Sequence, residues 1–332
     1  MADVELSSQR WRSFPRLLGD IGGTHARWAW QASANSDLQD ISVQRCRASA
    51  TLLDSARTYL AASGHAHPHS AAIGIASPVV GDVVRMTNNP WTFSINALKQ
   101  SLGVEHCLLL NDFTALAMSL PGLTAADLCP VGDGVAIAGA PIALIGPGTG
   151  LGVSGLLRTA DGKYCALSGE GGHVTLAATD EREAALLSLL RGRFGHVSAE
   201  RLLSGPGLVE LYRASCELHG RIALSLTPAE VSAAAIHASD PDCVASAFHF
   251  TAFLGTVAGN LALTLGAHGG VYIGGGVVPR LGTAFDGALF RQRFEDKGRY
   301  QDYLRAIPCW IITASTPALL GASRALDLIL AD

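Results

Sequence analysis

A short apolar segment that ends in a glycine-rich turn occurs three times in this chain, and it constrains the fold more than any other sequence feature. The segment and turn pairs are 17–19 with 20–24, 141–145 with 146–152, and 271–273 with 274–276. Short apolar runs bounded by glycine are typical of buried β-strands. Backbone N–H groups exposed in such turns bind phosphate oxygens, and glycine lets the chain approach them closely. We therefore expect an α/β protein whose strand ends bind an anion.

The three turns differ in the side chains that they add. In the first, Asp20 can hold Mg²⁺ through water, because Mg²⁺ keeps most of its hydration shell. Gly22 and Gly23 follow, and Thr24 offers a hydroxyl to a phosphate oxygen. The second turn repeats this pattern with Gly148, Thr149 and Gly150. The third, made of Gly274, Gly275 and Gly276, offers room for a flat base to lie against the backbone.

Two common phosphate-binding loops do not match these turns. A Walker A loop needs Gly-Lys-Ser/Thr at a set distance from an earlier glycine, and none of the three turns has it. Gly148, Gly150 and Gly152 alternate as in a dinucleotide-binding loop. However, no acidic residue about 20 residues further on ends a second strand. The turns therefore predict a nucleotide site of another class.

A carboxylate follows a further apolar strand, expected over 107–110. Asn111 and Asp112 stand at its carboxyl end, where α/β sheets place ligands. Asp112 is a candidate base for phosphoryl transfer, a reaction that depends mainly on positioning and charge neutralisation. The alternative is that Asp112 only caps the helix expected from Phe113.

A second polar group combines carboxylates with an imidazole. Glu170 and His173 flank two glycines, and Glu200 lies just inside a helix that Ser198 is expected to cap. As metal ligands, Glu170 and His173 lack a third partner nearby in the sequence. As sugar ligands they fit better, because a carboxylate accepts strong hydrogen bonds from hydroxyl groups. The alternative for Glu200 is that it only complements the helix dipole.

Length and composition limit the remaining classes. A chain of 332 residues suits two domains, and the break at Pro121-Gly122 is the expected first boundary. The net charge is −4 and no Lys/Arg run occurs, which disfavours nucleic acid as a partner. The uncharged stretches 134–157 and 243–279 contain glycines and polar residues, so we expect core elements rather than membrane spans. Seven scattered cysteines favour reduced thiols and a cytoplasmic location.

Six motifs together closely resemble the bacterial glucokinases outside the ROK group. The resemblance runs from about Leu17 to Leu330, with the motifs in order and at natural spacing. The motifs are Gly19-Asp20-Ile21-Gly22-Gly23-Thr24-x-Ala26-Arg27, Asn111-Asp112-Phe113-Thr114-Ala115, Gly148-Thr149-Gly150-Leu151-Gly152, Gly169-Glu170-Gly171-Gly172-His173, His196-Val197-Ser198-Ala199-Glu200-Arg201 and Gly274-Gly275-Gly276-Val277-Val278-Pro279-Arg280.

This resemblance implies a two-domain, actin-like (ribonuclease H-like) ATPase fold with a cleft between the domains. The domains expected are 17–121 plus 314–332, and 122–313. The implied activity is transfer of the γ-phosphoryl group from ATP, with Mg²⁺, to the 6-hydroxyl of glucose, the first step of glycolysis. It also implies a homodimer and, since the cysteine-rich zinc motif of ROK kinases is absent, no structural zinc.

The family's site residues carry over by position. Asp112 is implied to be the base, with Asn111 beside it. The implied ligands of the other sugar hydroxyls are Glu170, His173 and Glu200, with Gly150 as a backbone contact. A kinase for mannose, fructose or an N-acetylhexosamine, or a sugar-sensing regulator, remains an alternative.

Two features depart from the family's pattern. Position 25 is His, where Asn is common in the first turn, and this can change phosphate contacts or pH dependence. Residues 1–16 resemble an N-terminal extension.

Overall fold

The computed structural model describes residues 13–331, which divide into two compact units. The first unit comprises the chain up to Leu123, the segment Thr159–Ser168 and the chain from Ala314 onward; the second comprises Thr124–Arg158 and Gly169–Thr313. The expected boundaries place 159–168 in the larger domain. The segment is grouped with the first unit, although its strand Tyr164–Ser168 pairs in the sheet of the second. Residues 1–12 of the expected extension lie outside the described residues, and Arg16 is already a buried part of the first strand.

The first unit is built on a five-stranded sheet with the order β3-β2-β1-β4-β7. Its strands are β1 (Arg16–Ile21), β2 (His25–Gln31), β3 (Gln39–Arg45), β4 (Ser70–Ile75) and β7 (His106–Asn111). β1 pairs with β2 in antiparallel and with β4 in parallel orientation, and β4 is parallel to β7. β3 ends at Arg45, because Cys46–Ala48 forms a 3₁₀ turn.

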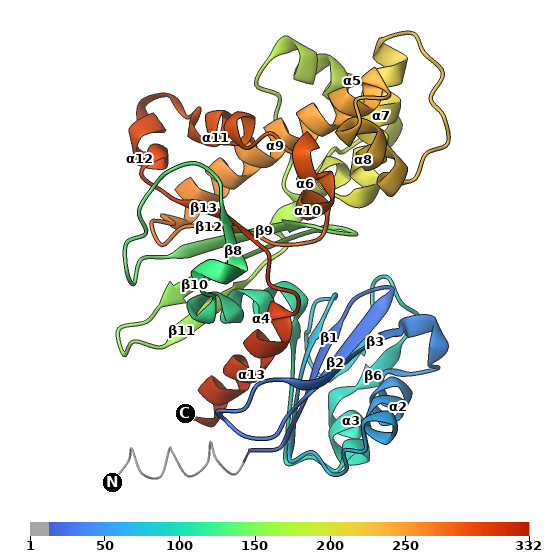
Figure 1. Ribbon diagram of the computed structural model, residues 1–332, viewed down its shortest axis with the longest axis vertical. Coiled ribbons are helices and arrows are strands. Elements are labelled where there is room, and N and C mark those ends of the chain that lie inside the picture. Colours follow the sequence, from blue (N-terminus) through green and yellow to red (C-terminus); the bar gives the residue numbers. More distant parts are fainter. Residues whose placement is uncertain (1–12, 332) are drawn as a thin grey trace. The chain divides into compact units, whose positions relative to one another are not determined.

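Helices cover both faces of this sheet (Figure 1). One face packs α2 (Leu52–Ser63) and α3 (Ile95–Leu102), and the other packs α4 (Asp112–Ser119) and α13 (Pro317–Leu330). A side chain caps the N-terminus of each of the first two helices. Thr51 accepts a hydrogen bond from the N–H of Asp54, and Ser94 accepts one from that of Ala97. A short hairpin of β5 (Val83–Arg85) and β6 (Thr92–Ser94) completes the unit.

The second sheet has the order β11-β10-β9-β12-β13-β8. Its strands are β8 (Leu128–Pro130), β9 (Ile142–Pro147), β10 (Leu151–Arg158), β11 (Tyr164–Ser168), β12 (Val271–Ile273) and β13 (Cys309–Ile312). β9 is antiparallel to β10 and parallel to β12, and β12 is parallel to β13. Apart from the edge strand β8, this order repeats that of the first sheet, so β9 and β1 occupy equivalent positions.

The second unit contains eight α-helices, which supply much of its buried core. They are α5 (Glu181–Phe194), α6 (Ala199–Leu202), α7 (Gly205–Leu218), α8 (Pro228–Ile236), α9 (Pro241–Leu265), α10 (Val277–Leu281), α11 (Gly287–Glu295) and α12 (Gln301–Arg305). Of the described helices, α9 is the one with the length and apolar composition of a membrane span, with a mean hydropathy of 1.3. However, 61% of that apolar stretch is buried inside the protein, as in a core helix. The expectation of a buried helix followed by a buried strand over 243–279 is therefore confirmed by α9 and β12.

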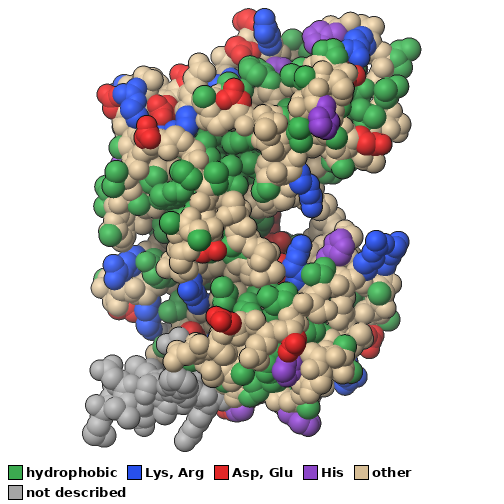
Figure 2. Space-filling model, in the orientation of Figure 1, with side chains coloured by type: hydrophobic (Ala, Val, Ile, Leu, Met, Phe, Trp, Pro, Cys, Tyr) green, Lys and Arg blue, Asp and Glu red, His purple; other side chains and the backbone are tan. Residues whose placement is uncertain are grey.

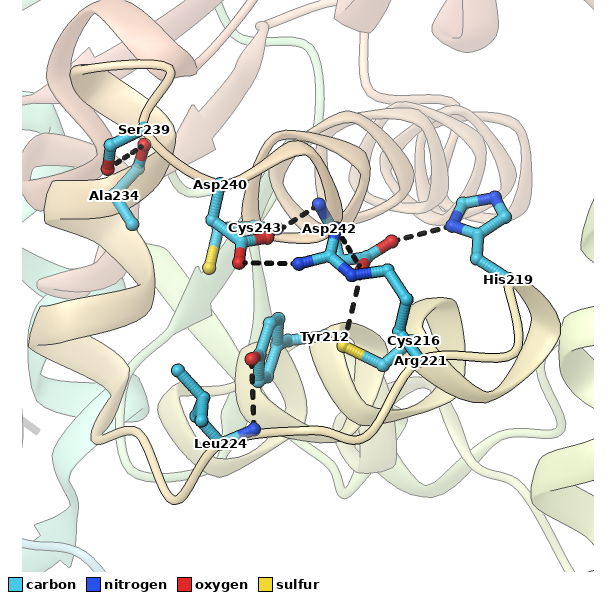
Figure 3. A network of polar contacts seen from close by, with 10 residues as sticks. All are labelled: Tyr212, Cys216, His219, Arg221, Leu224, Ala234, Ser239, Asp240, Asp242 and Cys243. Atoms are coloured by element: carbon cyan, nitrogen blue, oxygen red, sulfur yellow. Dashed lines mark hydrogen bonds and ion pairs between the residues drawn. The ribbon is translucent and has the colours of Figure 1, made fainter.

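A buried carboxylate ties the loop after α7 to the start of α9 (Figure 3). Asp242 is fully buried; its Oδ2 forms an ion pair with Nη1 of Arg221 at 2.9 Å and accepts a hydrogen bond from the thiol of Cys216 at 3.3 Å. Its other oxygen pairs with Nδ1 of His219 at 2.6 Å. A buried carboxylate needs such partners, because desolvation penalises an unpaired charge. We assign this network to stability rather than to catalysis.

The packing of α13 on α4 gives a test of the fold. A methyl group at Gly321 would lie 1.7 Å from the carbonyl oxygen of Ala115, so the helices can approach only because this residue has no side chain. We expect Gly321→Ala to lower the free energy of unfolding by at least about 2 kcal/mol through overpacking. Urea denaturation measures this loss.

Gly192→Ala is the matched control for that substitution. Gly192 lies in α5 with open space around it, so an added methyl group meets nothing. Its replacement should raise the stability by about 0.5–1 kcal/mol, because alanine loses less conformational entropy in a helix. Equal effects of the two substitutions would contradict the close helix packing.

Candidate active site

The first glycine-rich turn joins β1 to β2 and is held tightly by its surroundings. The N–H of Gly22 donates to the carbonyl of His25 at 2.9 Å, which closes the hairpin. A methyl group at Gly23 would lie 2.8 Å from Cβ of Asn88, so only glycine fits against that residue. Thr24 and His25 are exposed. The turn therefore combines a fixed backbone with an accessible hydroxyl, as a phosphate site requires.

Cys46 supports this turn from the interior. Its backbone N–H donates to the carbonyl of Thr24 at 2.9 Å, and its thiol donates to that of Gly22 at 3.4 Å. Burial raises the pKa of the thiol, which keeps it in the protonated form that can donate. The parts played by Cys46 and Asn88 have no signal in the sequence, because both residues lie apart from the turn along the chain and reach it only in the folded structure.

Asp20 lies at the end of β1, directly before this turn. Its Oδ2 accepts a hydrogen bond from Nη1 of Arg27, its cross-strand neighbour, at 3.1 Å. Burial raises the pKa of Asp20, and the Arg27 guanidinium opposes that rise. Among residues 13–331, no group of three or more His, Cys, Asp or Glu side chains is arranged to hold a metal ion. A single carboxylate beside a phosphate turn nevertheless fits Mg²⁺, which keeps several waters and is usually held by one or two carboxylates and the substrate.

The structure shows which of Asn111 and Asp112 caps the helix that follows them. Asn111 ends β7 and is the N-cap of α4, because its Oδ1 accepts hydrogen bonds from the N–H groups of Phe113 at 2.9 Å and Thr114 at 3.2 Å. The alternative that Asp112 serves as this cap is therefore wrong. Asp112 is the first residue of the helix, and its Oδ1 accepts a hydrogen bond from the N–H of Phe113 at 2.9 Å.

Strand register places Asp112 and the first turn at the same edge of the sheet. Ile21 at the end of β1 is level with Ile75 at the end of β4, and Ile75 is level with Asn111 at the end of β7. All three strands are parallel, so their carboxyl ends meet at this edge. The first unit thus gathers a phosphate-binding turn and carboxylates on one sheet edge, as expected for a ligand site in an α/β protein.

The second glycine-rich turn occupies the equivalent hairpin of the second sheet, between β9 and β10. Its Gly148 N–H donates to the carbonyl of Gly150 at 2.8 Å, and the Gly148 carbonyl accepts from the N–H of Gly205 at the start of α7, also at 2.8 Å. Thr149 stands between the two glycines and is exposed. The turn is thus braced by a helix that comes from elsewhere in the same unit.

Glu200 is locked against this turn. Its Oε2 accepts a hydrogen bond from the N–H of Leu151 at 2.9 Å, and a methyl group at Gly150 would lie only 2.4 Å from that oxygen. Ser198 caps α6 as expected. Glu200 therefore does more than complement the dipole of its helix, because its carboxylate reaches the turn. Only glycine at position 150 allows it to do so.

The loop of Glu170 and His173 lies beside Glu200. Backbone hydrogen bonds from Leu176 to Val197 at 3.0 Å and from Ala199 to Val174 at 2.9 Å hold the two segments together. This pairing brings Nε2 of His173 to 3.9 Å from Oε1 of Glu200. Glu170 and His173 are both exposed and belong to one turn, in which the His173 N–H donates to the Glu170 carbonyl at 3.0 Å.

The third turn packs directly on the end of β9, the strand that leads into the second turn. The N–H of Gly274 donates to the carbonyl of Ile145 at 2.8 Å. Gly275 has a φ of +77°, and a methyl group there would lie 2.3 Å from the carbonyl oxygen of Pro147, so this position requires glycine. That this turn offers room for a flat base stays a prediction. The guanidinium of Arg280 lies beside Gly276, 3.4 Å from where a methyl group would stand.

Each unit thus contributes a different kind of site. The first offers a backbone turn for phosphate oxygens together with the carboxylates of Asp20 and Asp112. The second offers two backbone turns and the group of Gly150, Glu170, His173 and Glu200, whose oxygens and imidazole suit the hydroxyls of a sugar. On the face shown in Figure 2, the Lys and Arg side chains of each unit are spread among polar and apolar ones rather than gathered in a stripe.

Comparison with known proteins agrees with this chemistry. The family model described as glucokinase matches residues 17–328. A glucokinase of Aromatoleum aromaticum is 55% identical over 320 residues, which is 96% of each chain. Among solved structures, a glucokinase from an Antarctic psychrotroph is 35% identical with a TM-score of 0.85, covering 94% of this chain and 98% of its own.

A more distant structure shares the fold. The ROK family glucokinase from Streptomyces griseus, solved with glucose and AMPPNP, is 18% identical with a TM-score of 0.63, covering 94% of this chain and 99% of its own. The expected fold, the actin-like ATPase fold of sugar kinases, is confirmed. With a family match over nearly its whole length and relatives of high identity, the chain belongs to the glucokinase family.

Proposed function

We propose that this protein transfers the γ-phosphoryl group of ATP to the 6-hydroxyl of glucose, giving glucose 6-phosphate and ADP. The observation that carries the proposal is the contact of Glu200 with the Gly150–Leu151 backbone, with His173 beside it, in a chain of the glucokinase family. A fixed carboxylate and imidazole next to a backbone turn can hydrogen-bond several sugar hydroxyls at once. The glucose and AMPPNP bound in the S. griseus structure support the choice of both substrates.

In the first unit, Asp112 accepts the proton of the 6-hydroxyl as the oxygen attacks the γ-phosphorus. An aspartate is a weak base, with a pKa near 4 in water. It suffices here because the hydroxyl loses its proton late, as charge moves through the transition state. Asn111 has committed its side-chain oxygen to the helix cap, so its Nδ2 remains to donate to the sugar.

The three glycine-rich turns offer backbone donors for the nucleotide. Gly22, Gly23 and Thr24 of the first turn and Gly148 and Thr149 of the second bind phosphate oxygens through N–H and hydroxyl groups. Gly274, Gly275 and Gly276 border the nucleoside. Asp20 would hold Mg²⁺ through water; the ion, when bound with ATP, neutralises charge on the β- and γ-phosphates.

The sugar is bound by the second unit. Glu170, His173 and Glu200 hydrogen-bond the hydroxyls that do not react, and Gly150 contributes its backbone. A site built to hydrogen-bond particular hydroxyls rejects sugars that lack them, because its own polar groups then stay unpaired. We further propose, from the resemblance and the scattered cysteines, a cytoplasmic homodimer that acts at the entry of glucose into glycolysis.

Substrate profiling tests the function. With ATP and Mg²⁺, the protein should release ADP only when sugar is present, and glucose should give the highest kcat/KM among glucose, mannose, fructose and N-acetylglucosamine. A coupled assay for ADP measures this. A higher kcat/KM for any other sugar would overturn the substrate assignment, and binding of glucose without ADP release would instead indicate a sugar-sensing protein.

The role of Asp112 is tested by Asp112→Asn. This exchange removes the base, and the fold should survive because Asn111, not Asp112, caps α4. We expect kcat to fall at least about 100-fold, the usual minimum for loss of general-base catalysis. Thermal unfolding should show a native transition. A folded variant with near-normal kcat would remove Asp112 from this role.

The contact between Gly150 and Glu200 is tested by a double-mutant cycle. Gly150→Ala forces the carboxylate of Glu200 away from Leu151, so KM for glucose should rise by roughly 10-fold or more, the effect of one lost charge-assisted hydrogen bond. If the methyl group acts through Glu200, adding it to Glu200→Ala should change KM little further. Additive effects of the two substitutions would show that Gly150 acts on its own.

A further inference from the structure

The guanidinium of Arg280 lies beside Gly276 of the third glycine-rich turn. A methyl group at Gly276 would be 3.4 Å from Cζ, 3.4 Å from Nη1 and 3.5 Å from Nη2 of Arg280. A point almost equally distant from these three atoms lies over the face of the planar group, not beyond its edge. The guanidinium therefore turns one face toward the open side of Gly276, where a side chain would otherwise stand.

The helix that carries Arg280 is firmly anchored. Val277, Val278 and Leu281 of α10 are buried in the core of the second unit. Gly275, just before the helix, is fixed against the carbonyl of Pro147. The Cα position of Arg280 is thus set by the core on one side and by the end of β9 on the other.

The charge of Arg280 is not compensated by an acidic neighbour. Arg280 is exposed, and within residues 13–331 its side chain takes part in no ion pair or hydrogen bond. In the same unit, Arg221, Arg291 and Arg293 are by contrast paired with carboxylates. An unpaired guanidinium beside a glycine turn is free to contact a ligand.

We propose that Arg280 is a specificity-determining residue for the nucleotide, which stacks its open face on the purine base of ATP. A guanidinium attracts the face of an aromatic ring through its charge and its flat shape, and a lysine ammonium does not share that shape. The first and second turns already supply donors for the phosphates. The third turn, with a planar cation on its surface, is left for the flat part of the nucleotide.

This inference rests on the proposed ATP-dependent reaction but makes a separate claim about the base. The full-length protein and its variants Arg280→Met and Arg280→Lys would be titrated with ATP and with CTP in a calorimeter. Arg280→Met keeps the length of the stem but loses the plane and the charge. Arg182→Met, an exposed arginine on α5, is the matched control.

We expect Arg280→Met to weaken ATP binding by roughly 5- to 30-fold, the range of a cation–π contact. CTP offers a smaller ring, so Arg280→Met should weaken CTP binding less than ATP binding. The ratio of ATP affinity to CTP affinity should therefore fall. Arg280→Lys should resemble Arg280→Met. In the assay for ADP, KM for ATP should rise while kcat and KM for glucose stay near the wild-type values, and Arg182→Met should leave all of them unchanged.

Three results would overturn the stacking role. Full recovery of ATP affinity in Arg280→Lys would point to a phosphate contact through charge alone. Equal losses for ATP and CTP would also remove the base from the contact. Unchanged affinity in Arg280→Met would remove Arg280 from the site. Calorimetry needs no turnover, so a protein that binds ATP but does not phosphorylate glucose would refute the proposed function and still decide this inference.

Discussion

The parallel pairing of β4 with β1 and β7 is the constraint on which the first half of the site depends. It makes Ile21, Ile75 and Asn111 level with one another, so a turn from the start of the chain and a helix cap from 90 residues later reach the same sheet edge. The second sheet repeats the arrangement around β9. In both sheets the central strand enters a tight hairpin whose glycines carry the backbone donors, so one backbone design serves twice.

Local signals made much of this fold predictable. The three strand and turn pairs, the caps of Thr51, Ser94 and Ser198, and the capping box that Thr227 forms with Glu230 are all encoded within a few residues. The repeat between the sheets and the assignment of Thr159–Ser168 to the first unit were not foreseen. They follow from pairings between distant segments, which carry no local pattern.

The residues of the candidate site also fall into those with a local sequence signal and those without one. Asp20, Asp112 and Glu200 could be selected because they stand at strand or helix ends, where ligands bind. Their partners could not, because the contacts of Cys46 with Gly22 and of Glu200 with Leu151 depend on how the chain folds in space. The capping alternative for Asp112 was wrong for a related reason: Asn111 and Asp112 compete for one helix end, and the backbone angles at Asn111 decide the outcome.

The bond from Leu151 to Glu200 also bears on the cost of binding. Oε2 of Glu200 is engaged by the protein itself, so the carboxylate has lost much of its rotational freedom before any ligand arrives. Ordering a flexible side chain at the moment of binding costs about 0.5–1.5 kcal/mol, and here the folded chain has already met part of that cost. Oε1 is left as the acceptor facing His173, with its direction set in advance. The direction in which this carboxylate accepts a hydrogen bond is thus fixed when the chain folds. Gly150 makes this possible by leaving room for the carboxylate, although none of its atoms takes part in the bond.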